Sequence, residues 1–319
     1  MDIQGAQSKD PQSKDPQSKD THSHGPGAPS FSAHLQAATA LHEVLFDHWI
    51  PHVFIGSFAF NLLGTTRPTT NIKVIIEDSI YSPTMSSRSG RTAQSTSTTS
   101  YTGQKFLEPI HRIRQLLVTM DERFSLIGSE TMPKHIFTAT IQVSEGEDGA
   151  ETETKVVVPV QTLRAGTLGL PRHLDQTLEV RGVPVLAPRY LLLTAIKQCA
   201  NRLESDRPEL MEELKADEKD IKWLLKRLAE VKEEVDFEGY LYGGTDPDPR
   251  DGKEAYADCM KAREDLCEKV GQLVRFWRQK GGEKEQKMVK NLRKALRDDD
   301  DWFEVIRKAG RLRRDGKFA

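Results

Sequence analysis

Apolar residues recur along this chain in two spacings, one typical of helices and the other of strands. From Leu35 to Trp49 they fall three or four apart, which predicts a helix over 33–48 with Ser32 as its N-cap. Short apolar runs predict strands. The further elements predicted up to residue 187 are a strand at Val53–Ile55, a helical segment at Ser57–Leu63, a strand at Ile72–Glu77, a helix at Phe106–Arg123, strands at His135–Val143 and Thr154–Leu163, and one strand at Leu178–Val185 with a turn or bulge at Gly182.

After Pro188 the pattern becomes helical. Pro208–Asp217 is longer and more charged than a short linker requires, and Gly243–Pro249 is a clear break. Apolar positions at helical spacing then predict three helices, at Ala255–Gln279, Lys284–Leu296 and Trp302–Ala309. The four aspartates Asp298–Asp301 are predicted to be a solvated N-terminal cap of the last helix rather than metal ligands. The chain is therefore predicted to be α+β, with a sheet and flanking helices followed by a helical C-terminal region.

Two segments contain too few apolar side chains to form a core. Residues 1–31 include tandem Gln-Ser-Lys-Asp-Pro repeats and are predicted to be a disordered tail. Residues 79–104, rich in Ser, Thr, Arg and Gly, are predicted to be a flexible insertion. The predicted organisation is thus a tail at 1–31, an α/β core at 32–187 with the insertion, and a helical region at 188–319.

The length and composition limit the number of domains and the class of protein. The chain has 319 residues, 37% of them apolar and 29% charged, with a net charge of −2, which is enough material for one large domain or two small ones. No apolar run is long enough for a membrane span, and the N-terminus does not resemble a signal peptide, so an intracellular protein, cytoplasmic or nuclear, is expected. The three cysteines are predicted to be reduced thiols. The repeats are typical of a eukaryotic protein.

The most informative stretch runs from Ile55 to Glu77. An apolar run stops at Gly56-Ser57, a short helical segment follows, and thirteen residues lie between Ser57 and Asn71, where the next strand begins. This pattern resembles the signature of the DNA polymerase β-like nucleotidyltransferase superfamily, in which a Gly-Gly or Gly-Ser turn precedes a strand with an Asp-x-Asp motif. The resemblance implies a nucleotidyltransferase-type mixed sheet.

A second stretch resembles the minimal and abortive-infection toxin-like members of that superfamily. These proteins have a Pro-x-x-Leu-Leu-x-x-Lys segment, then an arginine, then a Lys-Asp-x-x-Asp-Ile-like helix. This chain has Pro188, Arg202 and Lys219-Asp220-Ile221, with Asp217 or Asp220 in the acidic position. The two stretches bracket residues 53–228.

The family's metal ligands have no acidic counterparts at the matching positions. In the family, the Asp-x-Asp motif and a third carboxylate hold two divalent cations. This chain has Asn71, Lys73 and, on the later strand, Gln161, or Pro159 if the alignment shifts by two residues. Since Mg²⁺ requires hard anionic oxygen ligands, the resemblance implies a degenerate site without catalytic residues. A displaced site built from Glu77 with Glu151 or Glu153 is the remaining way to hold metal. Mg²⁺ with a nucleoside triphosphate is expected only if the protein is active.

The resemblance also implies nucleotide-binding residues, namely Gly56, Ser57, Arg67 and Lys73. Two roles stay open for Arg67, contact with a phosphate or stabilisation of the strand entrance through local carbonyls. Lys73 either pairs with a phosphate in place of the metal or lies on a solvated strand face.

Three functions follow as hypotheses. The first is an inactive nucleotidyltransferase-fold protein that binds a nucleotide or a macromolecular partner, and the second is an active transferase of nucleoside monophosphate to a hydroxyl. The third is an interaction protein whose helical C-terminal region binds protein or RNA, with the basic end Arg311, Arg313, Arg314 and Lys317 as a candidate contact. A membrane partner is not expected.

Overall fold

The structure, a computed structural model of the chain, describes residues 29–77, 109–127, 134–145, 150–167, 170–203, 205, 207–242 and 253–311. The predicted tail up to residue 28, the predicted insertion at 79–104 and the basic residues after Arg311 lie outside these ranges. Among the helices that the structure describes, none combines the length and the apolar character that crossing a bilayer requires.

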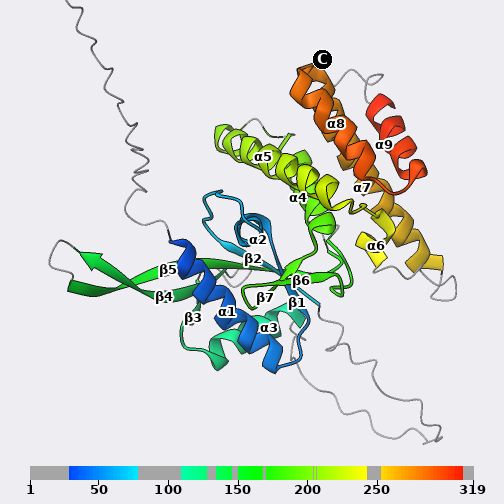
Figure 1. Cartoon of the computed structure of the whole chain (residues 1–319). Helices are drawn as coiled ribbons and strands as arrows, with labels where there is room; N and C mark the ends of the chain where they lie inside the picture. The colour runs from blue at the N-terminus through cyan, green and yellow to red at the C-terminus, as the bar shows by residue number, and fades with distance from the viewer. Residues whose placement is uncertain are drawn as a thin grey trace, which may run out of the picture.

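Among the described elements, helices and strands alternate up to residue 127, strands alone follow up to residue 186, and helices continue to residue 311 (Figure 1). The strands are β1 (His52–Ile55), β2 (Ile72–Ile76), β3 (Phe124–Ile127), β4 (Lys134–Glu145), β5 (Ala150–Arg164), β6 (Thr177–Val180) and β7 (Val183–Leu186). The helices are α1 (Phe31–Asp47), α2 (Gly56–Leu62), α3 (Pro109–Met120), α4 (Pro188–Leu203), α5 (Pro208–Val231), α6 (Phe237–Tyr242), α7 (Lys253–Lys280), α8 (Glu283–Ala295) and α9 (Asp299–Arg311).

The strands form one mixed sheet in the order β3-β4-β5-β2-β1-β7-β6. β2 lies between β1, to which it is antiparallel, and β5, to which it is parallel. β1 is in turn parallel to β7. This mixed sheet, with flanking helices and a helical C-terminal region, confirms the predicted α+β fold class.

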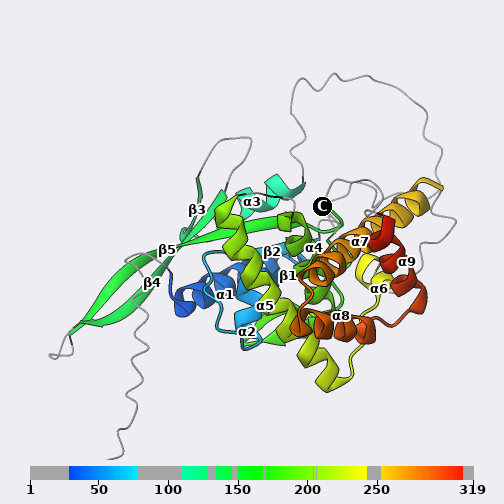
Figure 2. The same cartoon turned by 90° about the horizontal axis from the view of Figure 1, so that it is seen from above.

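The two central strands are buried because helices cover the sheet. All residues of β1 and all but one of β2 are buried, as expected for strands with both faces covered. In Figure 1, α1 and α3 lie below the sheet and α2, α4 and α5 above it, and Figure 2 gives the view from above. α2 packs on β1 and β2, and α4 packs on α2. The start of β2 therefore faces helices from the C-terminal half of the chain.

The C-terminal helices continue the same core. α7 packs on α4, α8 and α9, and α5 packs on α4 and α8. Fully buried Trp277 and Tyr240 belong to the same apolar cluster as the strand residues Phe54 and Ile75. The predicted division into parts at residue 188 stays a prediction.

Two strand predictions need correction. The single strand predicted at Leu178–Val185 is a hairpin of β6 and β7, because Arg181 and Gly182 adopt φ values of 53° and 77°. Two successive residues with positive φ make the type of turn that joins antiparallel strands. β3 was not predicted, and it is a short strand at the edge of the sheet, paired only with β4 within the described chain.

Two helix starts also differ from the prediction. Ser30, not Ser32, is the N-cap of α1, since its Oγ accepts a hydrogen bond of 3.2 Å from the Ala33 N–H. The segment Pro208–Asp217, which from the sequence was only longer and more charged than a short linker requires, is the first part of α5. Proline at the first helical position needs no N–H donor, so its presence there starts the helix rather than preventing it.

The predicted solvated cap at Asp298–Asp301 is partly wrong. Asp298 does cap α9, because its Oδ1 accepts from the Asp300 N–H at 2.8 Å. Asp301, however, is only 2% exposed and forms an ion pair of 2.6 Å with Arg263 of α7. This aspartate therefore joins α9 to α7 instead of lying in solvent.

Candidate functional site

A small cleft of about 180 Å³ opens where the β1–α2 turn and the start of β2 face α4 and α5. The residues lining it are Gly56, Ser57, Phe60, Arg67, Pro68, Thr70, Asn71, Lys73, Ala195, Gln198, Arg202, Glu213 and Asp217. Five residues singled out from the sequence therefore meet in one place. The sixth, Gln161, pairs in register with Lys73 across β2 and β5, but it is not part of the cleft lining described here.

The backbone at Gly56 brings the turn against the Lys73 side chain. Gly56 has a φ of +72°, which L-residues rarely adopt. A Cβ atom added at this position would lie 3.3 Å from Cδ of Lys73, so the stem of the lysine runs directly over the glycine. Gly56 thus serves both the turn and the placement of the lysine ammonium in the cleft.

We expect Gly56→Ala to affect ligand binding as well as stability. Alanine in the left-handed region lowers the free energy of unfolding by about 1–2 kcal/mol. Gly182→Ala is the matched control, because Gly182 has a φ of +77° and no heavy atom within 4 Å of an added Cβ. Urea unfolding should show similar losses for both variants, whereas titration with ATP should show weaker binding for Gly56→Ala alone. Equal affinities of both variants for ATP would contradict this role of Gly56.

Arg67 connects the loop before β2 to α5. Its Nη1 donates to Asp217 Oδ1 at 2.8 Å and to Asp220 Oδ2 at 2.5 Å. The sequence had suggested a phosphate or local carbonyls as partners, and the described partners are instead two carboxylates one helical turn apart. The backbone of this loop is fixed separately, because Asn61 Nδ2 donates to Arg67 O at 2.7 Å and to Thr69 Oγ1 at 2.8 Å.

Asp217 also accepts from a second arginine. Its other oxygen, Oδ2, pairs with Nη1 of Arg202 on α4, and Arg202 Nη2 lies 2.6 Å from Glu213 Oε2. Asp217 is buried and is shared by two cations, so it holds the β2 loop, α4 and α5 together at the cleft. Burial raises the pKa of the nearby Asp220 carboxyl, although its hydrogen bond with Arg67 acts in the opposite direction.

Lys73 has a different environment from the two arginines. Within the described chain its ammonium has neither a hydrogen bond nor a carboxylate within 4.0 Å. Burial, followed by the nearby charge of Arg202, lowers the pKa of Lys73, while Asp217 and Glu213 act in the opposite direction. The amine is thus a cation in a partly enclosed cleft that an added anion would stabilise.

The donors in the cleft do not fit a pair of Mg²⁺ ions. Asn71, Lys73 and Gln161 supply no carboxylate, and the two acids that line the cleft, Glu213 and Asp217, are bonded to arginines. No three His, Cys, Asp or Glu side chains in the described ranges converge on a possible metal position. No catalytic step through metal follows from these residues.

The displaced metal site built from Glu77 and Glu151 or Glu153 is contradicted by the sheet register. Glu77 follows the β2 residue that pairs with Arg164, at the end of β5, and its Oε2 accepts from the Leu174 N–H at 3.3 Å. Glu153 lies eleven residues before Arg164 on the same strand, paired with β4. At about 3.3 Å per residue, the two positions are roughly 35 Å apart.

The cleft residues that lie on α4 and α5 could be predicted only in part from the sequence. Arg202 and Asp217 belonged to the second family-like stretch but had not been predicted as site residues, and Gln198 and Glu213 had not been noted. The available signal was periodicity, since Ala195, Gln198 and Arg202 recur at the spacing of one helix face.

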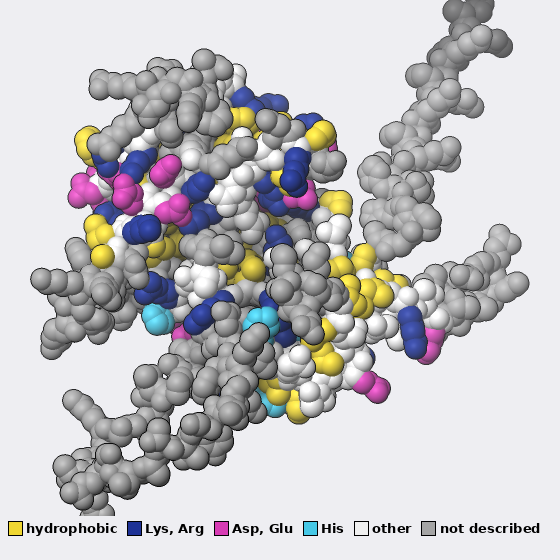
Figure 3. All heavy atoms as spheres, turned by 180° about the vertical axis from the view of Figure 1, so that it is seen from behind, with side chains coloured by type: hydrophobic (Ala, Val, Ile, Leu, Met, Phe, Trp, Pro, Cys, Tyr) yellow, Lys and Arg dark blue, Asp and Glu magenta, His cyan; other side chains and the backbone are white. Residues whose placement is uncertain are grey.

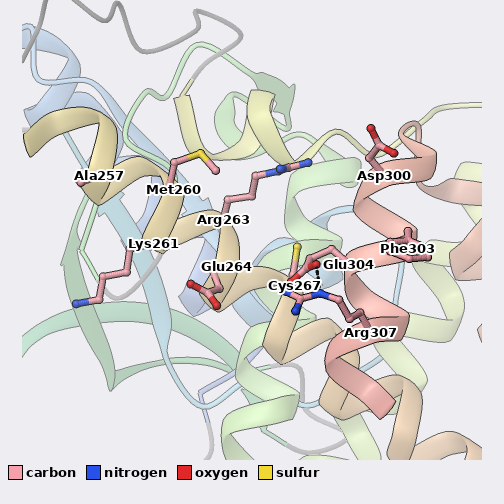
Figure 4. A pocket seen from close by; sticks show the side chains of 10 residues that line it. All are labelled: Ala257, Met260, Lys261, Arg263, Glu264, Cys267, Asp300, Phe303, Glu304 and Arg307. Carbon is pink, nitrogen blue, oxygen red and sulfur yellow. Dashed lines mark hydrogen bonds and ion pairs between the residues drawn. The ribbon is translucent and has the colours of Figure 1, made fainter. Parts of the chain in front are cut away.

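A larger cavity of about 850 Å³ lies between α7 and α9 (Figure 4). Four of the six charged residues that line it are paired within the protein, because Arg307 pairs with Glu304, Arg263 with Asp301 and Glu264 with Lys308. The Cys267 thiol on its wall is buried, and burial raises its pKa to about 12, so it is a poor nucleophile. On the face seen from behind, acidic and basic side chains are intermixed at the helical end of the molecule (Figure 3).

Among the comparisons with known proteins, the match comes from solved structures. No protein-family model and no curated protein sequence match this chain. Among solved structures, it is similar to the crystal structure of an antigenic nucleotidyltransferase-like protein from Paracoccidioides brasiliensis, with 11% sequence identity and a TM-score of 0.45. That match covers 85% of this chain and 97% of the other. The likeness concerns the course of the backbone alone.

Proposed function

We propose that this protein has a nucleotidyltransferase-type fold with a degenerate metal site, and that it binds the phosphate groups of a nucleotide in the cleft without transferring them. The observation that carries the proposal is the ammonium of Lys73, which has no ion-pair partner within the described chain and lies in a cleft with two arginines. Lys73 occupies the position of a metal-binding aspartate in the resembled family. In this proposal the Lys73 ammonium therefore supplies the positive charge that a divalent metal ion supplies in that family.

The size of the cleft limits the part of the ligand that it holds. Sites for drug-sized ligands usually enclose about 300–1,000 Å³, and this cleft has about 180 Å³. It therefore suits phosphate groups, while the base and ribose extend outside. Arg67 and Arg202 contribute positive charge at short range, but their hydrogen bonds to α5 make Lys73 the principal anion contact.

The test is calorimetric titration of the full chain with ATP, CTP, GTP and UTP, with and without Mg²⁺. Loss of a charge-assisted hydrogen bond of about 1.5–3 kcal/mol predicts that Lys73→Met weakens binding by roughly 10- to 100-fold. Lys155→Met is the control, since Lys155 is an exposed lysine on the β5 strand. Binding should persist without Mg²⁺, because the protein supplies the positive charge.

Two results would overturn the proposal. One is nucleotide binding that requires Mg²⁺ or is unchanged by Lys73→Met. The other is Mg²⁺-dependent incorporation from labelled triphosphates, in an assay that also includes Asn71→Asp, Lys73→Ala and Glu77→Ala. Robust wild-type incorporation that Glu77→Ala abolishes would instead establish an active transferase.

A further inference from the structure

A second, strongly basic groove lies between α5 and α8. It has a volume of about 650 Å³. The residues that line it are Lys219, Lys222, Trp223, Lys226, Glu283, Lys284, Lys287, Met288 and Asn291. Five lysines face one glutamate, although the whole chain has a net charge of −2. The groove is thus a local concentration of positive charge on a slightly acidic protein.

The lysines of the groove are available to a ligand. All five are exposed. Lys226 lies 3.7 Å from Glu230 of its own helix, and the other four have no carboxylate within 4.0 Å in the described part of the chain. On α5 they recur at i, i+3 and i+7, which places three charges in a row over about 10 Å. Two further charges face them from α8.

The floor of the groove is aromatic and apolar. Trp223 is half-buried against the core and lies between the lysines of α5, with the Arg227 guanidinium 5.5 Å from its ring centroid. Met288 is buried on the opposite wall. Lysines beside an accessible aromatic plane are the combination that binds the phosphates and the bases of unpaired nucleic acid.

The groove adjoins the cleft through an intermediate cavity. This cavity, of about 360 Å³, shares Lys219 and Trp223 with the groove and shares Arg67 and Pro68 with the cleft. A chain of phosphates in the groove would therefore pass close to the proposed nucleotide site.

We propose that the groove between α5 and α8 binds a single-stranded polynucleotide, with the five lysines on its phosphates and Trp223 against a base. An acidic peptide or an anionic lipid surface would satisfy the lysines alone. The aromatic side chain of Trp223 among the charges and the groove shape favour the polynucleotide. This inference does not rest on nucleotide binding in the cleft.

The experiment is fluorescence anisotropy of the full chain with labelled oligo(U) and oligo(dT), at several salt concentrations. The logarithm of the binding constant should fall with the logarithm of salt with a slope near −0.7 per phosphate contact, or about −3.5 for five lysines. Lys222→Ala/Lys226→Ala/Lys287→Ala should weaken binding at least about 10-fold and reduce the slope by about 2. The two oligonucleotides distinguish RNA from DNA as the source of the strand.

The matched control is Lys215→Ala/Lys290→Ala/Lys294→Ala. It removes the same charge from exposed positions of α5 and α8 outside the groove, and Lys215, like Lys226, pairs with a glutamate of its own helix. It should change affinity by less than about 2-fold. Equal weakening by both triple variants, or no binding at low salt, would overturn the proposal.

Two further measurements complete the test. One distinguishes the polynucleotide from other anionic partners, and the other distinguishes failure of this proposal from failure of nucleotide binding in the cleft. If polyglutamate or phosphatidylserine vesicles bind in a groove-dependent manner and the oligonucleotides do not, the proposed partner is wrong. ATP titration of the groove variant should match that of the wild type, since none of its three substitutions lies in the cleft. Loss of oligonucleotide binding with intact ATP binding therefore supports the groove independently of the proposed function.

Discussion

Asp217→Ala is expected to lower the free energy of unfolding by about 3 kcal/mol. The substitution leaves two partly buried guanidinium groups without the carboxylate that they share, because Arg67 and Arg202 bond to different oxygens of Asp217. Each arginine keeps one acidic partner, Asp220 or Glu213, so the loss is smaller than for a fully isolated buried charge. The melting temperature should fall by roughly 6–12 °C.

Urea unfolding at neutral pH measures this effect, with Asp299→Ala as the control. Asp299 also pairs with an arginine, Arg293, but its side chain is 83% exposed. An exposed pair contributes about 0–1 kcal/mol, so the control should remain near the wild-type stability. Similar losses for both variants would show that sharing of Asp217 between the two arginines does not stabilise the cleft. Unfolding should remain cooperative, since Leu214 and Ile221 still anchor α5 in the core.

The network around Asp217 also shows why the cleft could be predicted only in part. The β1–α2 turn and β2 were visible because an apolar run, a Gly-Ser pair and a second apolar run follow one another within a short stretch of sequence. Arg67 and Asp217 lie 150 positions apart, and nothing local to either residue indicates the other. The family-like stretch around Asp220 placed an acid near the site, but the ion pair with Arg67 follows from the packing of α5 on α4.

The errors in the predicted helices and strands also have physical causes. The hairpin at Arg181 and Gly182 was predicted as a single strand because arginine rarely adopts positive φ, so only the glycine signalled a turn. Charged residues hid the start of α5 at Pro208, where a helix exposes most of its first turns to solvent. Asp301 was predicted to be solvated with its three neighbours because Arg263, which buries it, belongs to another helix.

Acidification provides the second large effect, through a pair of histidines behind the cleft. His52, the first residue of β1, is 7% exposed, and its Nδ1 donates to Ile50 O at 2.8 Å. Its Nε2 lies 2.9 Å from Nδ1 of His42 on α1, a geometry that requires neutral His52 to accept there. The pKa of His52 is lowered from 6.5 to about 4, mainly by burial; the nearby His42 also lowers it, while the hydrogen bond to Ile50 O acts in the opposite direction.

We therefore expect the free energy of unfolding to fall as the pH is lowered from 7.5 to 5. In this range an unfolded histidine takes up a proton and folded His52 does not, so acid favours the unfolded state, with the effect starting near pH 6.5 and complete near pH 4. His52 alone contributes a loss of about 2 kcal/mol by pH 5. Burial also lowers the pKa values of His34 and His135, which adds to the loss in the same direction.

Urea unfolding at pH 7.5, 6.5, 5.8 and 5.0 tests this expectation, with His52→Gln as the informative variant. Glutamine cannot titrate, so the variant should start less stable at pH 7.5 and lose about 2 kcal/mol less than the wild type on the way to pH 5. His173→Gln is the control, because it replaces a histidine whose side chain is 54% exposed instead of a buried one. A wild-type stability that stays constant over this range would show that folded His52 takes up a proton as readily as the unfolded residue does, and its Nε2 would then donate to His42 instead of accepting from it. Since β1 runs from His52 to Ile55, directly before Gly56, protonation of this pair would also disturb the turn that places Lys73 in the cleft.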